Sequence, residues 1–305
     1  MSRSAVYSPA MSKESIGTAS AARTAETPTS NAPVLEAALE KQQCLFRALA
    51  ALDSLLVAFS GGADSAYLAW AAHTVLGQRA LAITALSASF SAHDRGEAEA
   101  FARAAGLRHE FIETHEFENP LYVANGADRC FHCKDELFTR MEELAAARGF
   151  AAIAYGINAD DTHDFRPGHR AAAEHRVLAP LLDARLSKSE IRALSRSAGL
   201  ATWDRPASAC LSSRVPYGTS VTPARLAQIE RGEAVLRELG FRQFRVRTHD
   251  ELARIEIAPD ELPRGLDPEL ARRLSAAFKE LGFTYVTLDL EGYRQGSLND
   301  ALRKK

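Results

Sequence analysis

Three cysteines stand in segments whose neighbouring residues suit chemistry, and two of them form a pair. Cys130 and Cys133 lie in "RCFHCKDELF", residues 129–138, with His132 between them as an expected solvated spacer. A C-x-x-C pair is typical of a redox disulfide, half of a zinc site or part of an iron–sulfur site. The sequence has no second C-x-x-C, which excludes a zinc site built from four cysteines. Two partly buried structural cysteines at the start of a helix are the alternative.

Cys210 occupies a different environment, "TWDRPASACLSSRVPYGTSVT", residues 202–222. Arg205 and Arg214 are near in sequence, and nearby positive charge favours the thiolate, which is the nucleophilic form of cysteine. A structural cysteine would need apolar neighbours, and these are sparse here. The segment therefore predicts that Cys210 is a functional cysteine.

A glycine-rich turn in "LVAFSGGADSAYLAWAA", residues 56–72, follows an apolar run and opens a helical pattern. Such a turn directs backbone N–H groups and the positive end of the helix dipole at one point, which suits a phosphate. Gly61 and Gly62 allow close approach, Ser60 and Ser65 add hydroxyl donors, and Asp64 could orient the turn or hold the Mg²⁺ that accompanies ATP. An ordinary strand-to-helix turn is the alternative, and the string is neither a Walker A loop nor a G-x-G-x-x-G fingerprint.

The elements that must position these residues follow from the periodicity of the chain. Continuous apolar runs at 54–59, 80–90 and 151–158 predict buried parallel strands, and helical patterns cover 35–52, 63–76, 95–105 and 134–148. This alternation predicts an α/β fold with a doubly wound parallel sheet. After residue 204 the chain predicts a smaller α+β part, with one helix in 222–241 that stops at Gly240 and another in 268–283. Half-buried, antiparallel strands are predicted at 241–249 and 253–259, followed by a strand at 284–293. We expect a disordered tail at 1–33 and domains at 34–204 and 205–305.

Composition limits the classes of partner and compartment. The 305 residues carry a formal net charge of -2 and are 46% hydrophobic, which gives no sign of a surface for long nucleic acid. No apolar stretch is long enough to cross a membrane, and four cysteines do not make a disulfide framework. We therefore expect a cytoplasmic protein whose default partner is not long nucleic acid.

The string "SGGADS", residues 60–65, matches the SGGxDS signature of the PP-loop ATP pyrophosphatases. The resemblance implies that the turn holds the pyrophosphate of ATP, with Mg²⁺, while AMP is transferred to an oxygen of the substrate. AMP is a better leaving group than a carboxylate oxygen, so the adenylate is open to a nucleophile. The superfamily includes ammonia-using and sulfur-using members, and the turn by itself does not distinguish them.

Further segments in order along the chain resemble the LarE family of ATP-dependent sulfur transferases: "YGINADD", "FRPGHRAA", "APLLDARLSKSEIRALSRSAGLATWDRPASACLSSRVPYGTSVT" and "FRVRTHDELARIEI". The resemblance runs from about residue 40 to about residue 290. It implies adenylation of a carboxylate of pyridinium-3,5-biscarboxylic acid mononucleotide and conversion to a thiocarboxylate, for synthesis of a nickel-pincer cofactor. Cys210 then delivers sulfur and is left as dehydroalanine. The resemblance also implies a homo-oligomer, a hexamer.

Three cysteines together also resemble the iron–sulfur tRNA thiolases, which hold a 4Fe-4S cluster with one open iron. On that resemblance we expect Cys130, Cys133 and Cys210 to bind such a cluster. A sulfide on the open iron would then reach the adenylate, and the enzyme could turn over repeatedly.

Other residues have candidate roles around the nucleotide and the substrate. Gly156 and Asn158 end a predicted strand beside the expected nucleotide crevice. Asp160 or Asp161 could orient Mg²⁺ or the nucleotide, although a plain acidic loop also explains the two aspartates. Arg245 and Arg247 alternate on one strand face and, with Arg214, could bind the substrate phosphate; a solvated sheet face is the alternative. By family analogy Glu233 and Glu256 form a second metal site, and surface positions explain them equally well. Trp203 is expected to stack on the pyridinium ring or simply to pack.

Three alternative functions share parts of this pattern. A tRNA thiolase would share the turn and the three cysteines, but it should present a basic surface for tRNA. An amidating synthetase of the same superfamily would use ammonia and would not need Cys210. A nucleotide-binding module without catalysis is the third.

Overall fold

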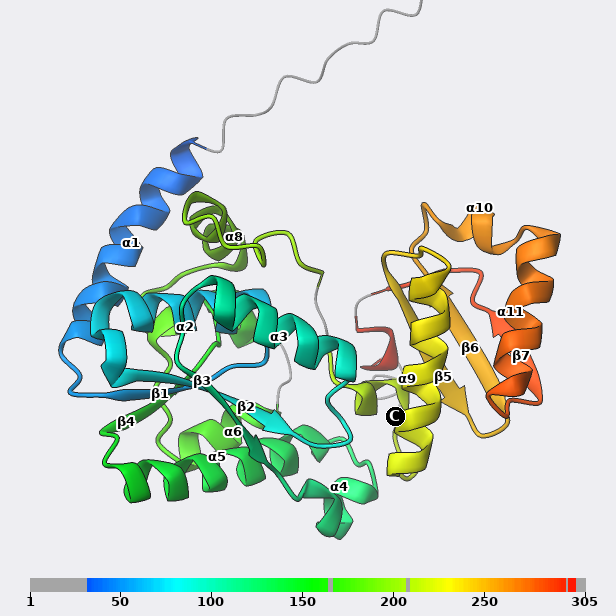
Figure 1. Ribbon diagram of the computed structural model, residues 1–305, viewed down its shortest axis with the longest axis horizontal. Coiled ribbons are helices and arrows are strands. Elements are labelled where there is room, and N and C mark those ends of the chain that lie inside the picture. Colours follow the sequence, from blue (N-terminus) through cyan, green and yellow to red (C-terminus); the bar gives the residue numbers. More distant parts are fainter. Residues whose placement is uncertain (1–31, 164–166, 207–208, 295, 300–305) are drawn as a thin grey trace, which may run out of the picture. The chain divides into compact units, whose positions relative to one another are not determined.

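Four parallel strands form the sheet that carries the glycine-rich turn (Figure 1). In this computed structural model, which describes residues 32–163, 167–206, 209–294 and 296–299, the strand order is β3-β2-β1-β4. The strands are β1 (Leu55–Ala58), β2 (Ala80–Leu86), β3 (His109–Glu113) and β4 (Ala152–Tyr155). Since β2 and β4 flank β1, the chain winds away from β1 in both directions. A crevice at the carboxyl ends of β1 and β4 is the usual ligand position in such a sheet.

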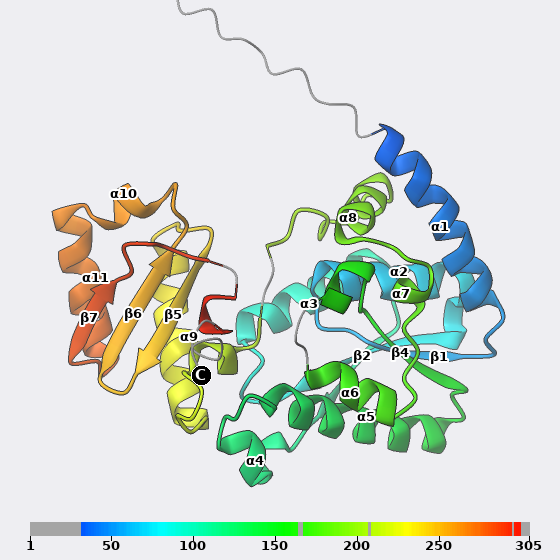
Figure 2. The same cartoon turned by 180° about the vertical axis from the view of Figure 1, so that it is seen from behind.

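Helices cover both faces of this sheet, as Figures 1 and 2 show from opposite sides. Alternate residues of β1 separate the two layers, because Leu55 and Val57 join one apolar cluster and Leu56 and Ala58 join the other. One face packs against α1 (Ala32–Ala50), α2 (Ala63–Leu76), α3 (Ala92–Ala104), α7 (Pro180–Asp183) and α8 (Lys188–Ser197). The other packs against α5 (Arg129–Arg148) and α6 (Pro167–Glu174). The parallel α/β architecture predicted from the apolar runs is therefore confirmed.

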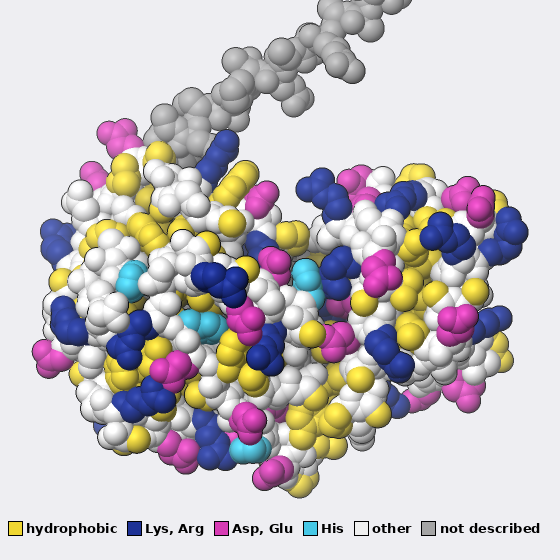
Figure 3. Space-filling model, viewed as in Figure 1, with side chains coloured by type: hydrophobic (Ala, Val, Ile, Leu, Met, Phe, Trp, Pro, Cys, Tyr) yellow, Lys and Arg dark blue, Asp and Glu magenta, His cyan; other side chains and the backbone are white. Residues whose placement is uncertain are grey.

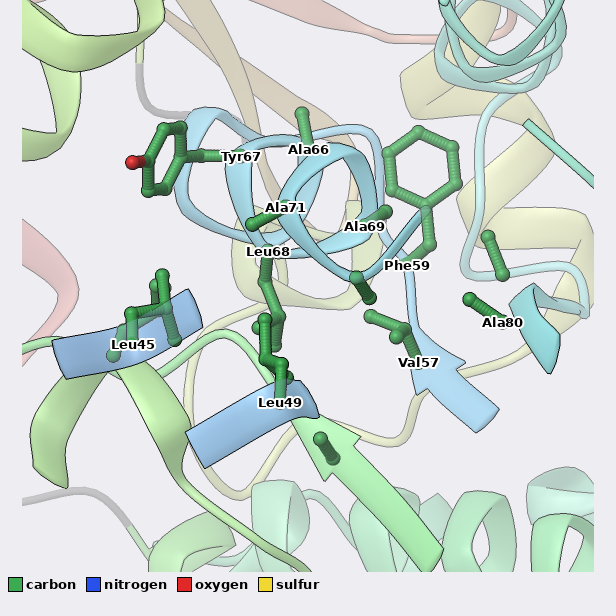
Figure 4. Packing of buried hydrophobic residues seen from close by; sticks show 14 of the residues in the cluster. Leu45, Leu49, Val57, Phe59, Ala66, Tyr67, Leu68, Ala69, Ala71 and Ala80 are labelled. Atoms are coloured by element: carbon green, nitrogen blue, oxygen red, sulfur yellow. The ribbon is translucent and has the colours of Figure 1, made fainter. Parts of the chain in front are cut away.

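Helix α2 is buried along most of its length, which fixes the position of its first turn. Figure 4 shows Leu68 and Ala71 directed toward Leu45 and Leu49 of α1, while Phe59 and Val57 lie beside Ala69. All seven side chains have at most 3% of their surface exposed. Small residues on α2 allow this close approach to both neighbours. The glycine-rich turn is thus held between a buried strand and a buried helix.

A second sheet follows later in the chain, in the order β5-β6-β7. Strands β5 (Phe244–His249) and β6 (Leu252–Ile257) pair antiparallel, as predicted, and β7 (Tyr285–Leu288) pairs parallel to β6. Helices α9 (Pro223–Glu238) and α11 (Pro268–Glu280) pack on its apolar face, and α10 (Leu262–Gly265) and α4 (Pro120–Val123) complete the described α-helices. The side chains of Arg245 and Arg247 lie on the opposite face of β5 from Val246, which is in the core.

The predicted tail and the predicted domain boundary both stay predictions. The predicted tail at 1–33 lies almost entirely outside the described residues. The boundary at residue 204 stays a prediction, since residues 32–305 group as one compact unit by backbone contacts. Among the described helices, none is both long enough and apolar enough to cross a membrane.

Candidate functional site

The turn from Ser60 to Ser65 lies where β1 ends and α2 begins. Gly61 has a φ of +76°, a left-handed conformation that glycine adopts without strain. Ser65 organises the turn, because its hydroxyl accepts from the Ser60 amide at 3.2 Å and donates to the Gly62 carbonyl at 3.0 Å. In the part of the chain that the structure describes, no side chain caps α2 at Gly62, so the first amides of this buried helix keep their capacity to donate. This arrangement suits an anion.

Asp64, Asn158 and Asp161 come together beside this turn. The Asn158 amide nitrogen Nδ2 donates to Oδ2 of Asp64 at 3.1 Å, and the backbone N–H of Asn158 donates to Oδ2 of Asp161 at 3.3 Å. Burial raises the pKa of Asp64, and Asp161 adds to the rise, whereas Lys188 opposes it. Among the described residues, Oδ1 of Asp64 is buried without a hydrogen-bond partner. A buried carboxylate oxygen without a hydrogen-bond partner is a suitable ligand for Mg²⁺.

Gly156 lies against the first turn of α2, which gives a steric reason for glycine at this position. A Cβ atom there would come within 2.8 Å of both the backbone nitrogen and Cα of Ser65. Contacts that short do not occur without displacement of one of the two segments. Gly156 therefore lets the end of β4 approach the Ser60–Ser65 turn.

Arg205 connects the glycine-rich turn to the segment that leads to Cys210. Its Nη1 donates to the Gly61 carbonyl at 2.9 Å, and its Nη2 bonds Oδ1 of Asp94 at 3.0 Å. The carbonyl of Arg205 in turn accepts from Arg192 at 2.7 Å. The sequence suggested that Arg205 acts on the Cys210 thiol, whereas these bonds go to the glycine-rich turn and to α3.

Cys210, which the sequence predicts to be a functional cysteine, is exposed at the start of a short 3-10 helix, Leu211–Arg214. Its carbonyl accepts from Ser213 Oγ at 2.7 Å and from Arg214 Nη1 at 2.8 Å. The next amide, that of Leu211, donates to the Ser89 carbonyl at 2.9 Å. The backbone around Cys210 is thus fixed, while its thiol is open to solvent.

Comparison with known proteins identifies the chain. It is 44% identical over 271 residues to the uncharacterized protein slr1717 of Synechocystis sp., covering 89% of this chain and all of that protein. It is 36% identical over 265 residues to the pyridinium-3,5-bisthiocarboxylic acid mononucleotide synthase of Lactiplantibacillus plantarum, covering 87% of this chain and 95% of the synthase. The chain belongs to the LarE family. No protein-family model matches it.

In this LarE family member, two of the predicted phosphate ligands are engaged in buried ion pairs. Arg214 bonds Glu233 through Nε at 2.8 Å and Nη2 at 3.1 Å. Arg247 bonds Glu256 in the same two-point manner, at 3.0 and 2.9 Å. All four side chains are at least 90% buried. Their predicted roles, phosphate binding for the arginines and a second metal site for the glutamates, stay predictions, but each carboxylate already neutralises a guanidinium.

Two other residues of this LarE chain were predicted to contact the substrate, Arg245 and Trp203. Arg245 has an aromatic neighbour and Trp203 has a cationic one. The Arg245 guanidinium lies 5.1 Å from the ring centre of Tyr293, and burial, together with the charge of Arg214, lowers the pKa of Arg245. The ring of Trp203 is partly exposed, with the Arg196 guanidinium 4.8 Å from its centre. Neither position tests the predicted contacts with substrate.

The C-x-x-C pair of this LarE chain stands in the first turns of α5. Cys130 is exposed, whereas Cys133 is partly buried against the core of the second sheet, and burial raises the pKa of its thiol. His132 is buried rather than solvated, because its ring packs edge-on against Phe131, so that expectation is wrong. In the described parts of the chain, no three His, Cys, Asp or Glu side chains are grouped to hold a metal ion. The three cysteines as arranged here do not form such a ligand set, and the cluster stays a prediction.

Two residues that sequence reasoning did not single out lie just before the C-x-x-C pair in the sequence. Arg129 immediately precedes Cys130 and is 3% exposed, and Asn125 is fully buried with a φ of +57°. Asn125 Nδ2 donates to the carbonyls of Pro216 and Thr219 at 2.8 and 2.9 Å. Their position beside the C-x-x-C motif was the available signal, but burial of an arginine is not readable from a single sequence.

Proposed function

We propose that this LarE family member is an ATP-dependent sulfur transferase acting on a carboxylate of pyridinium-3,5-biscarboxylic acid mononucleotide. The observation that carries the proposal is the connection between two sites. Arg205 bonds the glycine-rich turn through the Gly61 carbonyl, and Cys210 lies five residues further along the chain with its thiol exposed. A turn suited to phosphate and a nucleophilic sulfur are thereby held by adjacent parts of one segment.

The first half of the proposed reaction is adenylation. A substrate carboxylate oxygen attacks the α-phosphorus of ATP, and pyrophosphate leaves into the Ser60–Ser65 turn, whose amides and hydroxyls stabilise its charge. Asp64 would hold the Mg²⁺ that accompanies ATP, and this ion would supply positive charge to neutralise the departing group. Asn158 holds Oδ2 of Asp64 at 3.1 Å and so orients the carboxylate.

The second half transfers sulfur. The Cys210 thiolate attacks the acyl carbon, AMP leaves with the bonding electrons, and a thioester forms. Loss of the Cα proton and cleavage of the Cβ–Sγ bond then give a thiocarboxylate and a dehydroalanine at position 210. The exposed Cys210 is accessible for this attack. Because Cys210 itself supplies the sulfur, the first turnover requires no separate sulfur donor, whether another protein or a cluster.

The experiment that tests this proposal measures the two halves separately. Wild-type protein should exchange labelled pyrophosphate into ATP when the biscarboxylate nucleotide is present, and should lose the mass of one H₂S as thiocarboxylate forms. Cys210→Ala should retain exchange and form no thiocarboxylate. Thiocarboxylate formation by Cys210→Ala, or wild-type exchange that ignores the nucleotide, would refute the proposal.

A further test distinguishes Cys210 from a cluster-bound sulfide as the source of sulfur. Anaerobic reconstitution with iron and sulfide should leave the protein without iron if Cys210 is the donor. Bound iron together with repeated turnover and an intact Cys210 would assign the sulfur to cluster-borne sulfide instead.

A tRNA substrate is the less favoured alternative. On the face shown in Figure 3, basic and acidic side chains are intermixed, and the whole sequence carries a formal charge of -2. A tRNA thiolase should instead gather basic residues over a large area. Binding of tRNA that weakens steeply with salt would favour this alternative.

A further inference from the structure

Three guanidinium groups converge on the backbone carbonyls of residues 209–214, here called the Cys210 turn. Arg214 Nη1 donates to the carbonyls of Ala209 and Cys210. Arg129 Nη1 donates to the Ser212 carbonyl at 2.8 Å, and Arg247 Nη1 donates to the Ser213 carbonyl at 2.6 Å. The donors come from three elements: the 3-10 helix itself, α5 and β5. Four of the six carbonyls in the turn are therefore held by arginine.

The two buried glutamates keep two of these arginines in place. Glu233 on α9 fixes Arg214 by two bonds, and Glu256 on β6 fixes Arg247 by two bonds. A two-point pair defines the plane of the guanidinium as well as its position, so the remaining nitrogen has a defined direction. Both remaining Nη1 atoms point at the Cys210 turn.

Arg129 differs from the other two because no carboxylate among the described residues holds it. Within the described residues no Asp or Glu forms an ion pair with it, and its acceptors are the Ser212 carbonyl, Oδ1 of Asn125 at 2.6 Å and the Sγ atom of Cys130 at 3.9 Å. A guanidinium that is 97% buried is costly without an anion. Although burial opposes its charge, Cys210 and Cys130 favour it and raise the pKa of Arg129. By geometry, the guanidinium contacts Cys130 and holds the Ser212 carbonyl of the Cys210 turn.

We infer that Arg129, Arg214 and Arg247 are positioning residues that hold the Cys210 turn so that its sulfur reaches the adenylate. Arg129 also joins this turn to the helix that carries Cys130 and Cys133. The inference rests on the proposed sulfur transfer. It predicts a specific separation: loss of an arginine from this set impairs sulfur transfer and leaves adenylation intact, because the adenylating turn has its own contacts with Ser65 and Arg205.

Arg129 is the residue to test, because its removal leaves no buried carboxylate behind. Arg129→Met keeps the length of the side chain and removes all donors, and Arg129→Lys keeps a charge and at least one donor. The matched control is Arg140→Met on the same helix, where the arginine is more exposed and pairs with Glu136 and Glu143. Each variant is assayed for nucleotide-dependent ATP–pyrophosphate exchange and for the single-turnover rate of thiocarboxylate formation.

The expected result for Arg129→Met is exchange within about threefold of wild type and transfer slowed by about 10²-fold, the usual cost of a misplaced reacting group. Arg129→Lys should recover part of the transfer rate, and Arg140→Met should change neither rate. Equal loss of both rates in Arg129→Lys, or unchanged transfer in either folded variant, would overturn the inference. Failure of wild type in either assay would refute the proposed function instead, so the two failures are distinguishable.

Discussion

Asp64 presents one carboxylate oxygen without a partner among the described residues, and burial raises its pKa. A raised pKa means that folding disfavours the ionised form, so Asp64→Asn should raise the melting temperature at pH 8. The gain should vanish at low pH, where the carboxyl is protonated in both the folded and the unfolded state.

The same substitution should also affect activity. Asparagine keeps an acceptor for Asn158 but loses the charge that suits Mg²⁺, so ATP–pyrophosphate exchange should fall by about 10²-fold. Thermal melts at two pH values and exchange at limiting Mg²⁺ check this; unchanged exchange would contradict the proposed metal role.

Gly156 provides a second residue-scale prediction, which concerns shape alone. Gly156→Ala introduces a Cβ 2.8 Å from backbone atoms of Ser65 and must displace either β4 or the first turn of α2. We expect exchange to fall by about 10²-fold. Gly96→Ala on α3 is the control, because a Cβ there meets nothing within 4 Å and should stabilise the helix by about 0.5–1 kcal/mol. Equal exchange rates for the two variants would show that the close approach is unimportant.

At the scale of elements, α6 is tied to α5 by a histidine between two carboxylates. His175 Nε2 lies 2.9 Å from Oδ1 of Asp135, and Nδ1 lies 3.1 Å from Oε2 of Glu142. Although burial lowers the pKa of His175, these two hydrogen bonds raise it overall. A raised folded-state pKa stabilises the protein fully below the unfolded pKa of about 6.5, and the contribution is lost as pH rises through the folded-state value.

His175→Ala should therefore lower the free energy of unfolding by on the order of 1 kcal/mol more at pH 5.5 than at pH 9. Urea unfolding at both pH values gives this difference directly. Asp135→Asn with Glu142→Gln removes both charges and should abolish the pH dependence of the His175→Ala effect. A pH-independent effect in the wild-type background would show that His175 acts only by packing.

Strands with a continuous apolar run, such as β1, were predictable from the sequence, whereas two other elements were missed. Strand β3, "HEFIE", was missed because it lies at the edge of the sheet, where its half-buried, partly polar residues break the continuous apolar run. Helix α8 was also missed, although its capping box from Ser187 to Glu190 was a readable signal.

The arginines of the site show why residue roles are harder to predict than elements. Alternation along β5 correctly placed Arg245 and Arg247 on one face. It could not indicate that Glu256, on the neighbouring strand, bonds Arg247, or that Glu233, 19 residues from Arg214, bonds that arginine. Charged side chains on a strand pattern fit a phosphate site and a buried ion pair equally well, and only the tertiary contacts distinguish them.

At the scale of the whole chain, segments preceding residue 204 take part in the core of the second sheet. Tyr122 of α4 is 1% exposed within that core, and its Oη lies 2.7 Å from Oγ of Ser212. Backbone bonds reinforce the contact, because the amides of Val221 and Gly218 donate to the carbonyls of Val123 and Asn125 at 2.9 and 3.0 Å. The second sheet therefore has a core that residues 205–305 cannot complete alone.

Cooperative unfolding of both sheets follows from this shared core. Tyr122→Ala should lower the free energy of unfolding by about 3–5 kcal/mol, the usual cost of removing a buried aromatic ring. Tyr122→Phe removes only the hydrogen bond with Ser212 and should cost about 1 kcal/mol. Calorimetry of wild type and both variants should give one transition that moves as a unit. Two separate transitions, with Tyr122→Ala lowering the temperature of only the one assigned to residues 205–305, would mean that the second sheet folds independently. The Cys210 turn would then be held mainly by contacts within residues 205–305.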